Sequence, residues 1–204
     1  MDILKKNLDL KGVHKGKRCF ILGNGPSTNN QDLLLLENEI KIVVNDIYKH
    51  EKIKKINPNY WICVDPLFFE KKEQYLTPLI NAVEEKEIHV KMFFPINYVY
   101  GKCEIPRTDF LNLHYLKLDG SKTIDEDINF AQGIPVYSQN VIIVAMMLAF
   151  HLGANPIYLL GCDHTWWKFS KEDYSNNSVV DHSYQGASQS YSESHTYDFL
   201  QTTI

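Results

Sequence analysis

The chain has 204 residues and a formal net charge of -4, with 44% hydrophobic and 23% charged residues. This balance is typical of one globular domain, which we expect to span residues 1–204. No segment approaches the roughly 18 consecutive apolar residues that a membrane-spanning helix needs, and we find no apolar run of a signal peptide. The sequence therefore argues against membrane-embedded, collagenous and secreted classes. Its mild acidity also disfavours nucleic acid as a partner.

Residues 1–17 are rich in lysine, and we predict that they form a solvated basic leader. The alternative is a peripheral contact with an acidic membrane surface at the inner face of the membrane, because clustered lysines attract anionic headgroups. Further along the chain, Cys19, Cys63 and Cys162 lie in apolar runs, where cysteine behaves as a small hydrophobic residue. No C-x-x-C motif is present, so we predict buried structural thiols and a reducing, cytoplasmic location.

Short apolar runs rich in β-branched and aromatic residues recur along the chain and predict buried strands. The predicted strands are Arg18–Gly23, Lys41–Asp46, Tyr60–Asp65, Val90–Pro95, His114–Asp119 and Ile157–Asp163. They lack a clean alternation of apolar and polar residues, as expected for strands covered on both faces, and the intervals between them leave room for helices. We therefore predict an α/β, Rossmann-like fold with a mostly parallel sheet flanked by helices.

Two helices are predicted between the strands. One spans about Pro66–Lys86 and is weakly amphipathic. The other, Val141–Phe150, is continuously apolar, so we expect it to be buried against the sheet. Ser138 is its expected N-cap, and Gly153 is the expected left-handed residue after its end.

Residues 170–204 are rich in Ser, Asn, Gln and Tyr and poor in aliphatic residues, which predicts a polar lid or loop rather than core. The run Ser190–Ile204 is typical of the start of a helix, and no strand is predicted after it. We expect either a truncated or a naturally short version of a doubly wound domain.

The segment FILGNGPST joins the first strand to a glycine turn and a predicted helix. We expect Gly23 and Gly25 to permit positive φ and close backbone approach, and Pro26 to pre-set the first helical turn. Backbone amides of such a turn can face a phosphate. The dinucleotide fingerprint G-x-G-x-x-G is incomplete, since Thr28 takes the place of the third glycine, and the P-loop lysine is absent. A tight turn without a ligand is the alternative.

Polar residues end three other predicted strands: Asn45 and Asp46, then Asp65, then Asp163 and His164. Because the carboxyl ends of parallel strands line one ligand crevice in an open α/β sheet, we expect these side chains to converge beside the glycine turn. Amides and carboxylates there suit recognition of a ribose, a nucleobase or a metal. Alternatively, they cap helices and close turns.

His182 lies in the motif DHSYQG, within the polar C-terminal segment. A loop histidine with an ordinary pKa near 6.5 suits general-base chemistry, although such residues are equally common as surface decoration.

Four motifs together resemble two related families. They are GNGPS, Asn45 at the end of the second strand, INPNYWICVDP and LAFHLGANPIYLLGCDHTW, and the resemblance covers Lys17–Trp167. One family is the bacterial sialyltransferases, which transfer sialic acid from CMP to surface glycans. The other is the hydroxymethylpterin diphosphokinase-like family, whose bacterial members are associated with surface-polysaccharide synthesis.

The resemblance to sialyltransferases implies that Asn24 and Asn45 contact the CMP moiety and that His182 is the general base. The arginine that this family carries before the apolar helix has no counterpart here, since Ile134 and Pro135 occupy that region. The resemblance to diphosphokinases instead implies ATP with Mg²⁺, for which Asp65 and Asp163 are the natural carboxylate ligands.

From these observations we predict a nucleotide-dependent transferase, specifically a sialyltransferase-like glycosyltransferase that needs no cofactor. Its expected partners are a nucleotide-sugar donor and a glycan acceptor, and a homo-oligomer is compatible with the sequence. The alternatives are an ATP- and Mg²⁺-dependent diphosphokinase and a non-catalytic nucleotide-binding protein. The expected catalytic residues are His182, His164 and Asp163. The expected nucleotide-binding residues are Gly23, Asn24, Gly25, Pro26, Ser27, Asn45, Asp46, Asp65, Ser138 and Gly161.

Overall fold

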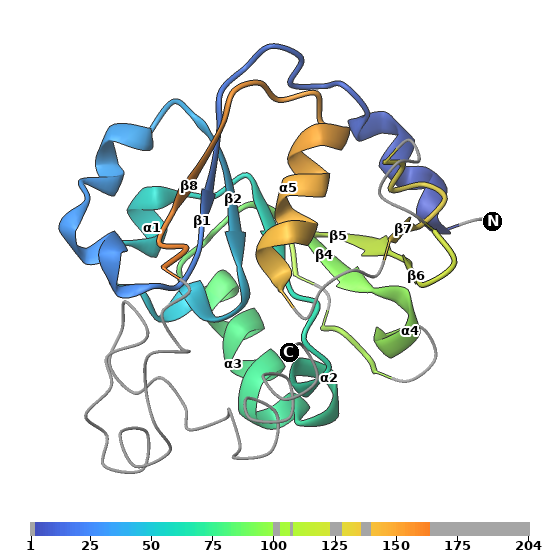
Figure 1. The fold of residues 1–204 in the computed structure, drawn as a ribbon. Helices are drawn as coiled ribbons and strands as arrows, with labels where there is room; N and C mark the ends of the chain where they lie inside the picture. The colour runs from blue at the N-terminus through green and yellow to red at the C-terminus, as the bar shows by residue number, and fades with distance from the viewer. Residues whose placement is uncertain (1–2, 100–102, 107, 123–127, 136–139, 164–204) are drawn as a thin grey trace, which may run out of the picture.

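The computed structural model describes residues 3–99, 103–106, 108–122, 128–135 and 140–163. At its centre, six parallel strands form a sheet in the order β5-β4-β3-β2-β1-β8 (Figure 1). The strands are β1 (Cys19–Leu22), β2 (Ile40–Val44), β3 (Tyr60–Ile62), β4 (Val90–Pro95), β5 (Leu111–Leu116) and β8 (Ile157–Leu160). A separate parallel pair is formed by β6 (Leu118–Asp119) and β7 (Ile134–Pro135). The predicted α/β, Rossmann-like fold with a mostly parallel sheet is confirmed.

The order of the strands reverses at β1. From β1 the chain builds β2 to β5 outward on one side, and it then returns to place β8 on the other side of β1. In open α/β sheets such a reversal leaves a crevice outside the carboxyl ends of the two strands that flank it, and ligands bind there. The reversal therefore places the ends of β1 and β8 at the preferred ligand position of the fold.

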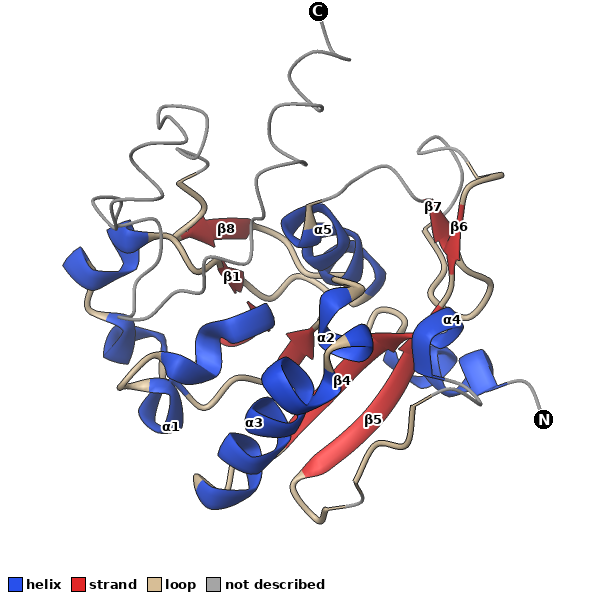
Figure 2. Ribbon diagram, turned by 90° about the horizontal axis from the view of Figure 1, so that it is seen from below, coloured by secondary structure: helices blue, strands red, loops and turns tan. Residues whose placement is uncertain are grey.

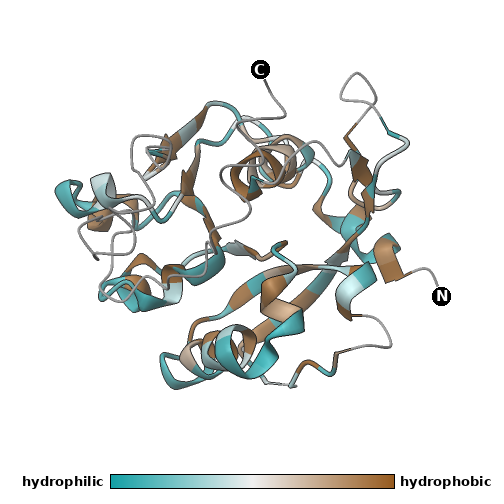
Figure 3. Cartoon of the chain, turned by 60° about the horizontal axis from the view of Figure 1, so that its bottom comes forward, coloured by the Kyte–Doolittle hydropathy of each residue, from teal (hydrophilic) through white to brown (hydrophobic). Residues whose placement is uncertain are grey.

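Helices cover both faces of the sheet (Figure 2). The α-helices are α1 (Ile53–Ile56), α2 (Leu67–Glu70), α3 (Lys72–Glu85), α4 (Ile96–Val99) and α5 (Val141–His151). Four short 3₁₀ helices accompany them: η1 (Ile3–Leu10), η2 (Pro26–Asn30), η3 (Leu33–Leu36) and η4 (Asn45–Lys49). α5 and η1 contribute to the apolar core on one face, and α1, α2 and α3 to the core on the other. Hydrophobic colour concentrates on the strands and on α5 (Figure 3).

The N-terminal segment differs from its prediction as a solvated leader. In η1, Leu4, Asn7 and Leu10 are buried, with Asn7 fully inaccessible to solvent. Their spacing of three residues matches the repeat of a 3₁₀ helix, so they form one stripe against β5 while Lys5 faces solvent. The segment docks on the sheet because this stripe carries enough apolar surface to offset its lysines.

Two predicted helices also differ in detail. The predicted helix over residues 66–86 is divided into α2 and α3 at Lys71, whose φ of -112° and ψ of 53° are not helical. The apolar helix is confirmed as α5, but its N-cap is Asn140, whose side chain accepts a hydrogen bond of 2.9 Å from the amide of Ile142. The predicted cap, Ser138, lies outside the described residues. Gly153 is left-handed as predicted, with a φ of 76°.

The predicted thiols are free, and two of the three are fully buried. Cys19 and Cys63 are inaccessible to solvent, whereas Cys162 is half-buried. Burial raises the pKa of the Cys19 thiol to about 12, so that thiol stays protonated and unreactive. Within the described ranges, no helix has the length and apolar character needed to cross a membrane.

Candidate functional site

The glycine turn after β1 is hydrogen-bonded to the end of β8. The amide of Gly23 donates to the carbonyl of Leu160, and the amide of Gly25 donates to the carbonyl of Gly161, each at 2.8 Å. The segment that follows one strand is thus joined to the segment that follows its neighbour, at the point where the order of strands reverses.

The junction between the glycine turn and the end of β8 leaves no room for a side chain at Gly23 or Gly25. A Cβ on Gly25 would lie 2.7 Å from the carbonyl oxygen of Gly161 and would overlap the carboxylate of Asp163. A Cβ on Gly23 would overlap the same carbonyl oxygen. Gly25 has a φ of -64°, and the left-handed glycine of the junction is Gly161, with a φ of 64°. Gly23 and Gly25 therefore do not adopt the positive φ that glycine permits, and the group that approaches their backbone closely is the segment after β8.

Asp163 closes the junction from the β8 side. Its Oδ2 accepts a hydrogen bond of 2.9 Å from the amide of Ser27, the second residue of η2. Pro26 begins η2, as predicted, and has no amide proton to offer. The amide of Thr28 donates to the carbonyl of Gly25. The expectation that the amides of this turn face a phosphate is therefore wrong for Gly23, Gly25, Ser27 and Thr28, because each already has an acceptor within the protein.

Three side-chain oxygens near this edge are buried without a hydrogen-bond partner among the described residues. They are Oδ1 of Asn24 in the glycine turn, and Oδ1 of Asn45 and of Asp46 directly after β2. Asn45 is left-handed, with a φ of 45°, and its carbonyl accepts a hydrogen bond of 2.9 Å from the indole of Trp61. The other oxygen of Asp46 pairs with Lys49 at 2.6 Å. Because buried acceptors without donors cost free energy, this arrangement is the one expected where a ligand supplies the donors.

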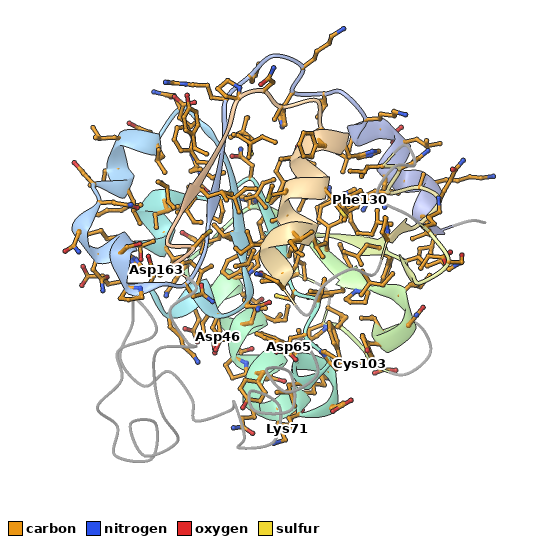
Figure 4. All side chains as sticks on the ribbon, viewed as in Figure 1. Asp46, Asp65, Lys71, Cys103, Phe130 and Asp163 are labelled. Atoms are coloured by element: carbon orange, nitrogen blue, oxygen red, sulfur yellow. The ribbon has the colours of Figure 1, made fainter. Side chains whose placement is uncertain are left out.

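Asp65 plays the capping role that sequence analysis left open. Its Oδ1 accepts a hydrogen bond of 2.9 Å from the amide of Leu67 at the start of α2. Burial raises the pKa of the Asp65 carboxyl, with further contributions from the charges of Asp46 and Glu70. In Figure 4, the labelled Asp46 and Asp65 lie below the strands at similar height, and Asp163 lies higher and to the left. As predicted, Asp46, Asp65 and Asp163 each follow the carboxyl end of a parallel strand, namely β2, β3 and β8.

This edge can bind groups that donate hydrogen bonds. Its unpartnered atoms are oxygens, and its charged side chains include three carboxylates, so hydroxyl and amino groups fit better than free phosphate. Over the part of the chain that the structure describes, no group of three or more His, Cys, Asp or Glu side chains is placed to hold a metal ion. Asp65 and Asp163, the pair expected to bind Mg²⁺, each already accept a hydrogen bond from a backbone amide.

A separate cavity of about 840 Å³ lies against β5. It is lined by Val99 of α4, by Leu111, Leu113 and Tyr115 of β5, and by the segment that contains Cys103. Sequence analysis did not single out these residues, because an apolar strand face gives the same pattern whether a helix or an open cavity covers it.

Three of the predicted site residues, His182, His164 and Ser138, lie outside the described residues, so their predicted roles stay predictions. Sequence analysis missed Trp61 and Lys49, which hold the Asn45 carbonyl and the Asp46 carboxylate. Lys49 follows Asp46 by three residues, a spacing that brings side chains together on one turn of a helix and could have indicated the pair.

No protein-family model, no curated protein and no solved structure matches this chain.

Proposed function

We propose that the protein is a nucleotide-dependent transferase, specifically a sialyltransferase-like glycosyltransferase that uses a CMP-activated sugar in surface-glycan synthesis. The observation that supports it best is the set of unpartnered buried oxygens on Asn24, Asn45 and Asp46. A cytidine presents matching donors, namely the two ribose hydroxyls and the exocyclic amine of the base. Binding would therefore replace three unsatisfied acceptors with hydrogen bonds.

The charge of the edge also favours this class of donor. Asp46, Asp65 and Asp163 follow the carboxyl ends of β2, β3 and β8, and their carboxylates oppose the approach of phosphate. CMP-activated sugars carry a single phosphate, whereas ATP carries three. Without a bound cation, the edge therefore suits the donor with fewer phosphate charges.

The proposed reaction is an in-line displacement. The acceptor hydroxyl loses its proton to His182, its oxygen forms a bond to the activated sugar carbon, and the bond from that carbon to the CMP oxygen breaks. CMP leaves with the electron pair of the broken bond. The nucleotide-binding residues position the donor so that attack and departure lie on opposite sides of the carbon.

An ATP- and Mg²⁺-dependent diphosphokinase is the second candidate, and the environment of Asp65 favours it. Burial is the main cause of the raised pKa of this carboxyl, the charge of Asp46 adds to it, and a divalent cation between the two groups would relieve that repulsion. Such an enzyme would lose its activity in EDTA, since the metal neutralises the triphosphate. The glycosyltransferase would keep its activity.

Calorimetric titration with CMP, ATP and NAD, each with and without Mg²⁺, tests the proposal. Asn45→Gly removes the unpartnered Oδ1 while keeping a residue that tolerates a φ of 45°. Asn57→Gly is the matched control, because Asn57 has a φ of 46° but is exposed at the end of α1.

We expect the wild type to bind CMP without Mg²⁺, Asn45→Gly to bind it at least about tenfold more weakly, and Asn57→Gly to match the wild type. Absence of CMP binding by the wild type, or unchanged affinity in Asn45→Gly, would refute the proposed site.

A further inference from the structure

Asp163 makes one described hydrogen bond to the glycine turn, and the donor is a backbone amide. Its Oδ2 accepts the amide proton of Ser27 at 2.9 Å, between residues 136 positions apart in the chain. A side-chain oxygen, whether of a carboxylate or of an amide, can accept this proton, so the contact depends on an acceptor atom at position 163. Asp163 therefore ties the start of η2 to the end of β8.

This bond belongs to a row of three between the same two segments. Gly23 donates to the carbonyl of Leu160, Gly25 to the carbonyl of Gly161, and Ser27 to the side chain of Asp163. Every second residue of the turn, from Gly23 to Ser27, is thus held by a hydrogen bond to the end of β8 or the segment after it. The first two bonds continue the ladder of β1 and β8, whereas the third needs a side chain because Gly161 is left-handed and turns the chain away.

Asn24 lies inside this row. Its backbone is held on both sides by the bonds of Gly23 and Gly25, and the segment that follows is held through Ser27. Its Oδ1 is one of the buried oxygens without a partner among the described residues. An acceptor can meet a ligand donor at hydrogen-bond distance only if the backbone that carries it is fixed, since such bonds weaken steeply with distance and angle.

We propose that Asp163 is a positioning residue, which fixes the glycine turn through the Ser27 amide so that Asn24 is presented to the nucleotide. This inference rests on the proposed function, and it replaces the expected catalytic or metal-binding role of Asp163. The role needs an acceptor atom on the side chain and does not need its negative charge. The substitution Asp163→Asn keeps an acceptor oxygen, whereas Asp163→Ala removes it.

The experiment compares Asp163→Asn, Asp163→Ala and a control, Asp32→Ala. Asp32 accepts an amide hydrogen bond from Leu34 at the start of η3, but it is exposed and makes no described bond to the glycine turn. Hydrogen exchange of the Ser27 amide is measured by NMR in the protein without ligand, and CMP affinity is measured by calorimetry in the presence of EDTA.

We expect Asp163→Ala to exchange the Ser27 amide at least about tenfold faster and to bind CMP at least about tenfold more weakly, while Asp163→Asn and Asp32→Ala stay within about threefold of the wild type. Equal losses in Asp163→Asn and Asp163→Ala would show that the charge is required and would overturn the proposal. Unchanged Ser27 exchange in Asp163→Ala would also overturn it.

The two proposals can fail separately. If the wild type binds no CMP, the proposed function is refuted, whereas the contact between Asp163 and Ser27 is still decided by the exchange of the Ser27 amide. If the wild type binds CMP and Asp163→Ala binds it equally well, the proposed function survives and the positioning role is refuted.

Discussion

Oδ1 of Asn7 lies 2.9 Å from Nδ1 of His114, and both side chains are buried. Asn7 also donates through Nδ2 to the carbonyl of Phe130, and its own carbonyl meets Nε2 of His151 at 2.9 Å. Because the amide oxygen of Asn7 can only accept, Nδ1 of His114 carries the proton. One side chain of the N-terminal segment therefore fixes the tautomer of a histidine in the sheet and joins η1 to β5 and α5.

Asn7→Ala should destabilise the fold strongly. The substitution removes the partner of a buried carbonyl and of a buried imidazole, and each such loss costs about 1–3 kcal/mol. We expect the free energy of unfolding to fall by about 2–4 kcal/mol in urea titration. Leu8→Ala is the control on the same helix, since Leu8 is 49% exposed and should change stability little. Equal stability of the two variants would contradict the role of Asn7.

Stability should fall on acidification through His114. Burial and the charges of Lys6 and Lys91 lower the pKa of His114 from 6.5 to about 3. Between these pH values the unfolded chain binds a proton at His114 that the folded protein does not bind. The contribution of His114 to the free energy of unfolding is therefore complete above pH 6.5 and is lost as the pH falls. Below about pH 6, the free energy of unfolding of the wild type should fall more steeply than that of His114→Gln, by up to about 1.4 kcal/mol per pH unit.

Urea titrations at several pH values measure this slope. His89→Gln removes an exposed imidazole and should keep the slope of the wild type. The burial of His14 and His50 also lowers their pKa values, so His114→Gln should keep part of the acid sensitivity. Parallel curves for the wild type and His114→Gln would contradict the prediction.

Gly23→Ala should loosen the junction between β1 and β8. The added methyl group would overlap the carbonyl oxygen of Gly161, which the backbone holds in place, so the two segments must separate. We expect a loss of about 1–3 kcal/mol in the free energy of unfolding, the usual scale for an overpacked site. Gly120→Ala is the matched control, because a Cβ there meets nothing within 4 Å. Similar free energies of unfolding for both variants would contradict the prediction, because they would show that the junction accommodates the methyl group without loss of stability.

His182→Ala tests the proposed general base. The variant should bind CMP with nearly unchanged affinity and turn over roughly 100- to 10,000-fold more slowly, the scale of a lost general base. Kinetic assays with a CMP-activated sugar measure the turnover, and His89→Ala serves as the control histidine. Near-normal turnover would move the search for the base to His164. A parallel loss of CMP affinity would make His182 a binding residue instead.

The positions of the strands were predictable because each is a short apolar run, and all six predicted runs overlap a strand of the sheet. Their order was not predictable from the same pattern. The place of β8 beside β1 depends on contacts between residues more than a hundred positions apart, such as the pairing of Cys19 with Ile157. Local patterns carry no signal for that pairing.

The candidate site was predictable by position and less so by mechanism. Gly23, Asn24, Gly25, Asn45 and Asp163 all lie where strand ends were expected to meet. Sequence analysis expected a ligand to approach Gly25, whereas Gly161 and Asp163 lie against it. A glycine next to a strand gives the same sequence pattern whether a ligand or another strand approaches it. The prediction of a solvated leader was wrong because it rested on the number of lysines. It did not consider the three-residue spacing of Leu4, Asn7 and Leu10, which are buried.

The docking of η1 covers part of one edge of the sheet, the outer edge of β5. Lys6 donates to the carbonyl of Leu113 at 2.8 Å and Asn7 to that of Tyr115 at 2.7 Å, so these two acceptors on the outer side of β5 are covered. A strand from another molecule would find them blocked, and natural proteins protect sheet edges in this way against aggregation. On the opposite side, β8 exposes Tyr158 by 42% and Leu159 by 45%. The docking of η1 therefore hinders a further strand from pairing with β5.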